Sequence, residues 1–228
     1  MTVSLAIDIG GTFTDAVLED NKQRFTAKVL TTKNHPEAGF LAAAKKVLNV
    51  SNMQPKDVDF IIHGTTLATN AIIERKGAKT ALLTTDGFTD SLEIAYEHRF
   101  EQSDLFMERP KPLVPRHLRL GIKERIAADG SILIPLDMSS VEEAIAKCRE
   151  EKVEAIAIGF LHCYTNDEHE KSVKSFIQST LPDIPVSISS QVSPEIREYD
   201  RLSTTVANAY ILPLMKTYLE NLGAALIQ

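Results

Sequence analysis

The octapeptide DIGGTFTD, residues 8–15, joins the first two expected strands of the chain. The apolar run VSLAIDI at 3–9 predicts a strand, and the glycine pair at 10–11 ends it. Further β-rich stretches follow at short intervals, at 14–18 and 25–32. Three strands joined by tight turns predict an antiparallel start to a sheet.

The same octapeptide contains residue types that suit phosphate binding. Asp8 closes an apolar strand, where a carboxylate is costly unless it is paired, and Mg²⁺ is one such partner. Gly10 and Gly11 let the main chain approach an anion and aim its N–H groups at it, and Thr12 and Thr14 add hydroxyl donors. The residues alone leave two interpretations open: a polyphosphate site with its metal, or an ordinary tight turn with an exposed aspartate. A Walker A loop is excluded because GxxxxGK[ST] is missing.

Downstream of these strands the pattern changes to alternating strands and helices, which predicts a parallel sheet with crossovers. The expected helices are at 36–48, 67–75, 139–151, 166–181 and 200–222, and the expected strands are at 58–62, 80–84, 153–160 and 186–189. A hairpin with a turn at Asp129-Gly130 is expected over 118–134, and the last helix is expected to bend near Pro213. We therefore predict an α/β protein with a mixed sheet and flanking helices.

A second stretch with chemical potential is HGTTLATN at 63–70, between an expected strand and a helix. Thr65 or Thr66 can cap that helix, whose free N–H groups favour an anion. His63 is a candidate acid–base group or hydrogen-bond donor, and Asn70 adds a polar group one turn into the helix. The competing interpretation is an ordinary capped helix beside a structurally hydrogen-bonded histidine.

A third stretch, residues 195–210, places five charged residues before a Ser-Thr-Thr sequence. A solvated helix start explains such a pattern. The functional alternative has Arg201 or the threonines at a phosphate.

Composition limits the class of protein. The chain has 228 residues and a net charge of −6, which argues against nucleic acid as a partner. Because no apolar run reaches the roughly 18 residues of a membrane span, no membrane partner is expected. The two cysteines form no CxxC pair and are expected to be reduced thiols of a cytoplasmic protein.

Together these stretches resemble the N-terminal domain of the hydantoinase A / 5-oxoprolinase family, which includes N-methylhydantoinases and subunits of ATP-dependent ketone carboxylases. The resemblance rests on DIGGTFTD at 8–15, HGTTLATNAIIERKGAKTALLTTDGF at 63–88, LVPR at 113–116, FLHCY at 160–164 and SPEIREYDRLSTTVANAY at 193–210. It implies the ribonuclease H-like fold of actin-like ATPases and sugar kinases, in which the hairpin between the first two strands holds the nucleotide phosphates.

The resemblance also implies ATP and Mg²⁺ as cofactors and a small cyclic amide as substrate. ATP would phosphorylate the ring carbonyl oxygen, so that water attacks a carbon bearing a good leaving group. The resemblance implies that Asp8 and His63 are catalytic and that Asp8 also binds the metal. It implies that the cofactor phosphates are bound by Gly10, Gly11, Thr12 and Thr14. The residues that it places near the substrate or a phosphate are Gly64, Thr65, Thr66, Asn70 and Arg201. Two alternatives are a ketone carboxylase subunit and a non-catalytic regulatory ATPase.

Proteins of that superfamily bind nucleotide between two lobes. Residues 1–228 would form one N-terminal lobe, with an inserted loop and hairpin around 90–137. The second lobe is expected from the rest of a longer chain or from a partner subunit, and the full-length form is expected to be an oligomer. The isolated fragment is expected to be inactive.

Overall fold

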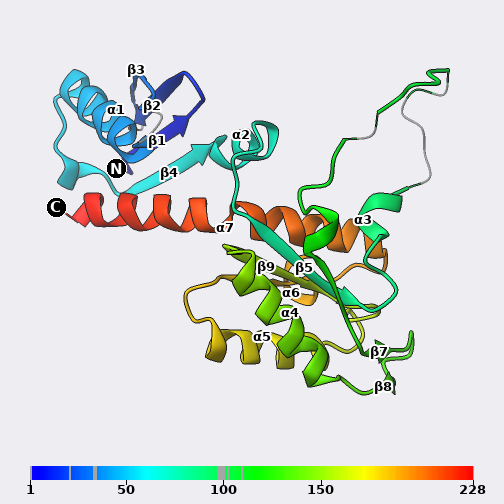
Figure 1. Ribbon diagram of the computed structural model, residues 1–228. Helices are drawn as coiled ribbons and strands as arrows, with labels where there is room; N and C mark the ends of the chain where they lie inside the picture. The colour runs from blue at the N-terminus through cyan, green and yellow to red at the C-terminus, as the bar shows by residue number, and fades with distance from the viewer. Residues whose placement is uncertain are drawn as a thin grey trace. The chain divides into compact units, whose positions relative to one another are not determined.

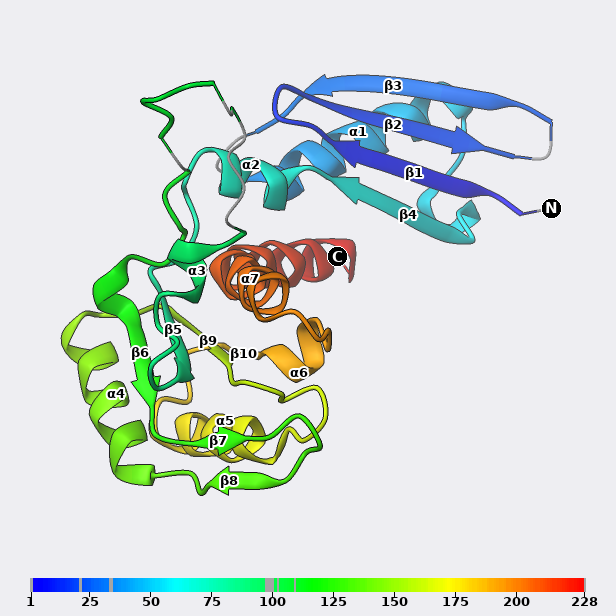
Figure 2. The same ribbon diagram turned by 90° about the vertical axis from the view of Figure 1, so that its right-hand side faces the viewer.

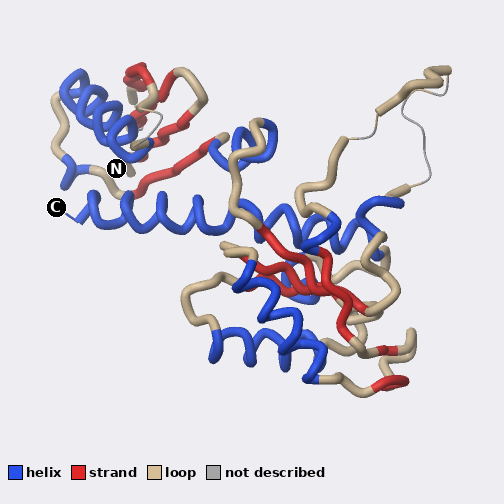
Figure 3. The backbone as a smooth tube through the Cα atoms, viewed as in Figure 1, coloured by secondary structure: helices blue, strands red, loops and turns tan. Residues whose placement is uncertain are grey.

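Two four-stranded sheets and one two-stranded hairpin contain the strands described by the computed structural model of the protein. The described residues are 2–20, 22–32, 35–96, 101, 103–108 and 110–227. They form two compact units. Unit 1 comprises Met1–Lys76 and Leu214–Gln228, and unit 2 comprises Gly77–Pro213. Figure 1 labels the elements of both units, and Figure 3 separates their helices from their strands by colour.

Unit 1 contains the first sheet, with strand order β3-β2-β1-β4. Its strands are β1 (Ser4–Ile9), β2 (Phe13–Glu19), β3 (Arg24–Leu30) and β4 (Phe60–Thr65). The first three are antiparallel, and β4 pairs with β1 in parallel (Figure 2). The α/β class with a mixed sheet is therefore confirmed.

Alternation along the strands creates the core of unit 1. Leu5, Ile7 and Ile9 of β1 are buried together with Phe40 of helix α1 (Pro36–Ser51). The end of the last helix completes this core with the buried Tyr218. The opposite face of β1, which includes Asp8, remains accessible because side chains alternate between the two faces of a sheet.

Unit 2 contains a second sheet, with strand order β10-β9-β5-β6, in which all pairs are parallel. Its strands are β5 (Thr80–Thr85), β6 (Arg119–Ile122), β9 (Ala155–Gly159) and β10 (Val186–Ile188). Every residue of β5 and β9 is buried, as expected of central strands in a parallel sheet. The predicted alternation of strands and helices is confirmed here.

Helices pack on both faces of the second sheet. In Figures 1 and 2, α4 (Met138–Glu150) and α5 (Glu168–Thr180) lie on one side, and the first half of α7 (Glu198–Ile227) lies on the other. The approach of α7 is close, because a Cβ on Gly159 would lie 2.1 Å from Leu202 Cδ2. The short elements are η1 (Pro55–Asp57), α2 (Leu67–Ile73), α3 (Ser91–Ile94), η2 (Arg116–Leu118), β7 (Arg125–Ile126), β8 (Ile132–Ile134) and α6 (Ser189–Val192).

Three predictions of local structure need correction. The strands form two sheets where one was expected. The expected hairpin over 118–134 divides, because Arg119–Ile122 pairs with β5 and only Arg125–Ile126 pairs with β8. Asp137, and neither Ser139 nor Ser140, caps α4, since its carboxylate accepts a hydrogen bond from the Ser139 amide.

Pro213 lies inside α7, which continues to Ile227, five residues beyond the predicted end. The expectation that the whole chain is one lobe stays a prediction, as does the insertion around 90–137. Residues 97–100, 102 and 109 of that expected loop lie outside the described part of the chain. In that described part, no helix combines the length and apolar character needed to cross a membrane.

Candidate functional site

The turn between β1 and β2 is closed by main-chain hydrogen bonds. The Gly10 amide donates to the Phe13 carbonyl at 2.9 Å, and a Cβ on Gly10 would lie only 3.0 Å from that oxygen. Thr31, at the end of β3, donates through its hydroxyl to the Gly10 carbonyl and through its amide to the Thr12 carbonyl, both at 2.9 Å. These hydrogen bonds fix the path of the turn, and a side chain at position 10 would crowd the Phe13 carbonyl.

The beginning of α2 lies against this turn. The Thr66 amide donates to the Ile9 carbonyl at 3.1 Å, and the Asn70 side chain donates to Thr66 Oγ1 at 3.2 Å. A Cβ on Gly11 would lie 3.4 Å from Asn70 Nδ2. The Thr65 hydroxyl accepts from the Leu67 amide at 3.1 Å, so this side chain satisfies an amide at the helix start. The structure thus brings Gly10, Gly11, Thr66 and Asn70 of the two stretches together.

A concavity of about 420 Å³ opens between the glycine turn and α2. Its lining includes Gly10, Gly11, Thr31, Thr66, Asn70 and Lys76. The sequence interpretation missed Thr31 and Lys76. Thr31 follows the glycine turn by twenty residues, and only strand pairing brings it there. Lys76 follows Arg75 just after a short helix, and nothing in the stretch 63–88 distinguishes it from the other charged residues.

Asp8 lies on the accessible face of the first sheet, beside Gly64 of β4. A Cβ on Gly64 would lie 3.0 Å from Asp8 Oδ1, so the carboxylate occupies space that only glycine leaves free. Among the described residues, none donates a hydrogen bond to this carboxylate. The expectation that Asp8 is a buried acid in need of a partner is wrong, because its side chain points away from the Ile7–Ile9 core.

Asp8 suits a magnesium ion of one particular kind. Within the described residues, no group of three or more His, Cys, Asp or Glu side chains could hold a metal ion. An all-protein cage is therefore not available there. Mg²⁺ is commonly held by one or two carboxylates together with substrate phosphates, and a single accessible carboxylate near a glycine turn fits that chemistry.

His63 and Asp8 lie on opposite faces of the first sheet, because His63 pairs with Ile7 in the parallel register. Its Nδ1 donates to the Ile7 carbonyl at 3.1 Å, and its Nε2 accepts from the Tyr218 hydroxyl at 2.6 Å. Burial raises the pKa of Tyr218 to about 12, which keeps the phenol protonated as this donor. Both ring nitrogens are thus engaged, and the two predicted catalytic side chains do not meet.

Thr14 also points away from the glycine turn. It is fully buried, and its hydroxyl lies 3.0 Å from Thr31 Oγ1 on the α1 side of the sheet. Its predicted phosphate contact is therefore not available in this arrangement. Thr12, by contrast, is exposed in the turn.

Arg201 belongs to unit 2, whereas the glycine turn belongs to unit 1. Its side chain is fully buried and donates to the carbonyls of Glu195 at 2.5 Å and Phe160 at 3.1 Å. The guanidinium also lies over the Tyr164 ring. These contacts join the start of α7 to the end of β9, so the structure gives Arg201 a supporting role in unit 2.

Changing Gly64 to alanine is expected to move the Asp8 carboxylate without lowering the stability of the fold. The new methyl group would force the Asp8 carboxylate to move, while alanine costs less backbone entropy than glycine in a strand. We expect the G64A protein to melt at an equal or higher temperature and, for the ATP-dependent chemistry that the family resemblance implies, to lose about tenfold in turnover. A thermal melt and a phosphate-release assay check both parts; unchanged turnover would show that the position of Asp8 is unimportant.

The two cysteines lie in the core of unit 2. Burial raises the pKa of Cys148 to about 11. Burial, followed by the negative charge of Glu170, raises that of Cys163 to about 12. We expect neither thiol to react with a thiol reagent at pH 8 until the protein unfolds, because only about one thiol in a thousand or fewer is ionised. Rapid modification of the folded protein would contradict this.

The chain is similar in sequence to a protein-family model and to several curated proteins. The model of the "Hydantoinase/oxoprolinase N-terminal region" matches residues 4–181. Caprolactamase subunit alpha of Pseudomonas jessenii is 40% identical over 96% of this chain and 33% of its own length. The acetophenone carboxylase gamma subunit of Aromatoleum aromaticum is 34% identical over 91% of this chain and 31% of its own. This chain therefore spans about a third of the length of these relatives.

A solved structure agrees with the sequence comparison. The ATP-dependent caprolactamase from Pseudomonas jessenii superposes with a TM-score of 0.90 at 39% identity, over 98% of this chain and 33% of that one. The fold of this chain is thus similar to that of a third of that enzyme's chain. The family model covers more than half of the chain, and we conclude that the chain belongs to the hydantoinase/oxoprolinase family.

Proposed function

We propose that this chain is the N-terminal, nucleotide-binding part of an ATP-dependent cyclic-amide hydrolase of the hydantoinase or 5-oxoprolinase type. The observation that carries the proposal is the closed Gly10-Gly11 turn, which borders a concavity together with α2 and is preceded by the accessible Asp8 carboxylate. Its similarity to an ATP-dependent caprolactamase supports the same activity. We place the glycine turn in the first sheet of an actin-like ATPase or sugar-kinase type of lobe.

The chain's own residues would do the work of positioning. The Gly11 amide and the Thr12 hydroxyl of the turn would face the phosphates. Asn70 and Lys76, which line the same concavity, would contact them from α2 and the residues after it. Asp8 would hold Mg²⁺. When bound, this ion would neutralise charge on the phosphates.

The proposed chemistry converts a poor leaving group into a good one. The ring carbonyl oxygen attacks the γ-phosphorus and ADP departs, which leaves a phosphorylated imidate. Water then adds to the ring carbon and loses its proton, and the ring C–N bond opens as the nitrogen is protonated, which leaves an acyl phosphate. A second water attacks the acyl carbon, and phosphate leaves with the original carbonyl oxygen, so both oxygens of the resulting carboxylic acid come from water.

Oxygen transfer tests this chemistry directly. A lactam labelled with ¹⁸O at its carbonyl, incubated with ATP and the full-length protein, is expected to give phosphate that carries the label. Mass spectrometry of the phosphate reads the result. Hydrolysis of ATP with unlabelled phosphate, or ring opening without ATP, would contradict the proposal.

A ketone carboxylase subunit is the second candidate, favoured by the similarity to the acetophenone carboxylase gamma subunit. That reaction consumes a ketone and an inorganic carbon donor. ATP hydrolysis that depends on both a ketone and bicarbonate, and that lactams do not stimulate, would favour this alternative.

A further inference from the structure

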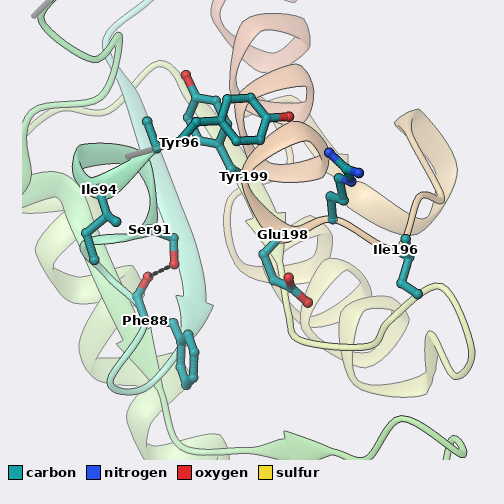
Figure 4. Close-up of a pocket in the computed structure, with 9 residues that line it drawn as sticks. Phe88, Ser91, Ile94, Tyr96, Ile196, Glu198 and Tyr199 are labelled. Carbon is teal, nitrogen blue, oxygen red and sulfur yellow. Dashed lines mark hydrogen bonds between the residues drawn. The ribbon is translucent and has the colours of Figure 1, made fainter. Parts of the chain in front are cut away.

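A second concavity, of about 610 Å³, opens in unit 2 between the segment after β5 and the start of α7. Its lining includes Phe88, Ile94, Tyr96, Ile196, Glu198 and Tyr199 (Figure 4). It lies beyond the carboxyl end of β5, and this end of a parallel sheet is where open α/β folds commonly bind ligands. The predicted stretch 195–210 contributes residues to this pocket, but the residues of that stretch that were predicted to bind phosphate do not line it.

Several large apolar side chains that line this pocket are exposed to solvent. Ile196 is 67% exposed, Ile94 is 56% exposed and Tyr96 is 40% exposed. They come from segments a hundred residues apart, yet they surround one concavity, as Figure 4 shows for the labelled side chains. Apolar surface gathered around a concavity marks a binding site for a largely apolar ligand.

The aromatic wall is held in place before any ligand arrives. The Tyr96 and Tyr199 rings meet edge to face, with centroids 4.9 Å apart. The Tyr96 hydroxyl donates to the Asp200 carboxylate in the first turn of α7, and this hydrogen bond raises the pKa of Tyr96. The phenol therefore stays protonated near neutral pH, and the wall is preorganised, which lowers the entropic cost of binding.

Charged groups lie at the edge of the apolar walls. Glu198 is half-buried, and its Oε1 is 3.9 Å from the Arg201 guanidinium, which leaves the carboxylate able to accept a further hydrogen bond. Arg197 also lines the pocket and offers N–H donors. The carboxylate of one residue accepts a hydrogen bond, and the guanidinium of its neighbour donates one. The pair can therefore bind a ligand that carries a donor and an acceptor side by side.

A small lactam ring has this combination of properties. Ring closure forces its amide into the cis form, so the carbonyl oxygen and the N–H lie on one edge, and the methylene groups form an apolar remainder. We propose that this pocket binds the ring of an uncharged cyclic amide, with the methylene groups against Ile94, Ile196 and the tyrosine pair and the amide N–H donated to Glu198. The substrate class rests on the proposed function; the pocket and its contacts rest on unit 2 alone.

Ligand-detected NMR with ε-caprolactam, without nucleotide, tests the site. We expect a dissociation constant of about 1 mM, ordinary for so small a ligand. I196S and I94S should each weaken binding about threefold or more, while L133S, which alters an exposed apolar residue of β8, should not. These positions are exposed, so the variants are expected to fold.

The role of Glu198 has its own matched comparison. N-methylcaprolactam lacks the N–H, and we expect it to bind the wild-type protein about tenfold more weakly than ε-caprolactam. E198Q should weaken the binding of ε-caprolactam and reduce the preference for the N–H compound. The control E143Q, on the exposed surface of α4, should change neither.

Failure of this inference differs from failure of the proposed function. In one outcome, the I196S, I94S and E198Q variants bind ε-caprolactam as the wild type does, while lactam-dependent ATP hydrolysis persists. This result would overturn the assignment of the pocket and leave the proposed function intact. Equal binding of the two lactams by the wild type would overturn the contact with Glu198. Specific binding that the variants weaken, with no ATP-dependent ring opening, would support the pocket and contradict the proposed function.

Discussion

Replacing Asp8 with alanine is expected to lower ATP-dependent ring opening by the full-length protein about 1,000-fold or more while leaving the fold unchanged. The carboxylate is accessible, and no described residue donates a hydrogen bond to it, so its removal breaks no structural contact. Its proposed work is confined to the metal and the phosphates. Phosphate release measures the activity, and a thermal melt should shift by no more than about 2 °C.

The matched control for Asp8 is the exposed Asp183 in unit 2. D183A removes the same group from the surface and should retain full activity. If D8A retained ATP-dependent activity as well, Asp8 would have no part in the chemistry, and the phosphate site would have to lie elsewhere.

Replacing Glu170 with alanine is expected to destabilise unit 2 by about 4 kcal/mol, because buried donors would lose their acceptor. This carboxylate is fully buried and accepts three hydrogen bonds, from the Phe160 amide at 3.1 Å, the Ser189 hydroxyl at 2.7 Å and the Ser190 amide at 2.9 Å. It therefore joins the ends of β9 and β10. Chemical denaturation followed by circular dichroism gives the free energy of unfolding.

Glu168 provides the control for this prediction, since it lies two residues earlier in the same helix and is exposed. E168A should change the free energy of unfolding by less than about 0.5 kcal/mol. A similarly small change for E170A would show that the three hydrogen bonds contribute little.

The local parts of this structure were predictable from the sequence, and the glycine turn is the clearest case. Its two strands and their tight connection depend on residues that are adjacent in the chain. The central strand β9 was predictable in the same way, because the apolar run at 153–160 leaves no polar face for a surface strand, but its place in a separate second sheet was not. The positions of Thr12 in the turn and of Asn70 one turn into α2 follow from the same local pattern, whereas their phosphate-binding roles stay predictions.

The features that could not be predicted from the sequence depend on contacts between residues far apart in the chain. His63 faces away from Asp8 because of the register between β1 and β4, and its partner Tyr218 is 155 residues further along the chain. Arg201 looked like a surface cation because of its charged neighbours, but the carbonyls of Phe160 and Glu195 provide it with a buried place. Neither arrangement follows from spacing or composition.

The position of the metal–nucleotide complex on the chain is the most direct test. Substoichiometric Mn²⁺ with ATP broadens the amide NMR signals of residues close to the ion, even when binding is weak. We predict that the amide signals of Gly10, Gly11 and Thr12 broaden first, and that the D8A protein loses this effect. Unchanged signals from this turn, with broadening confined to residues of unit 2, would contradict the account.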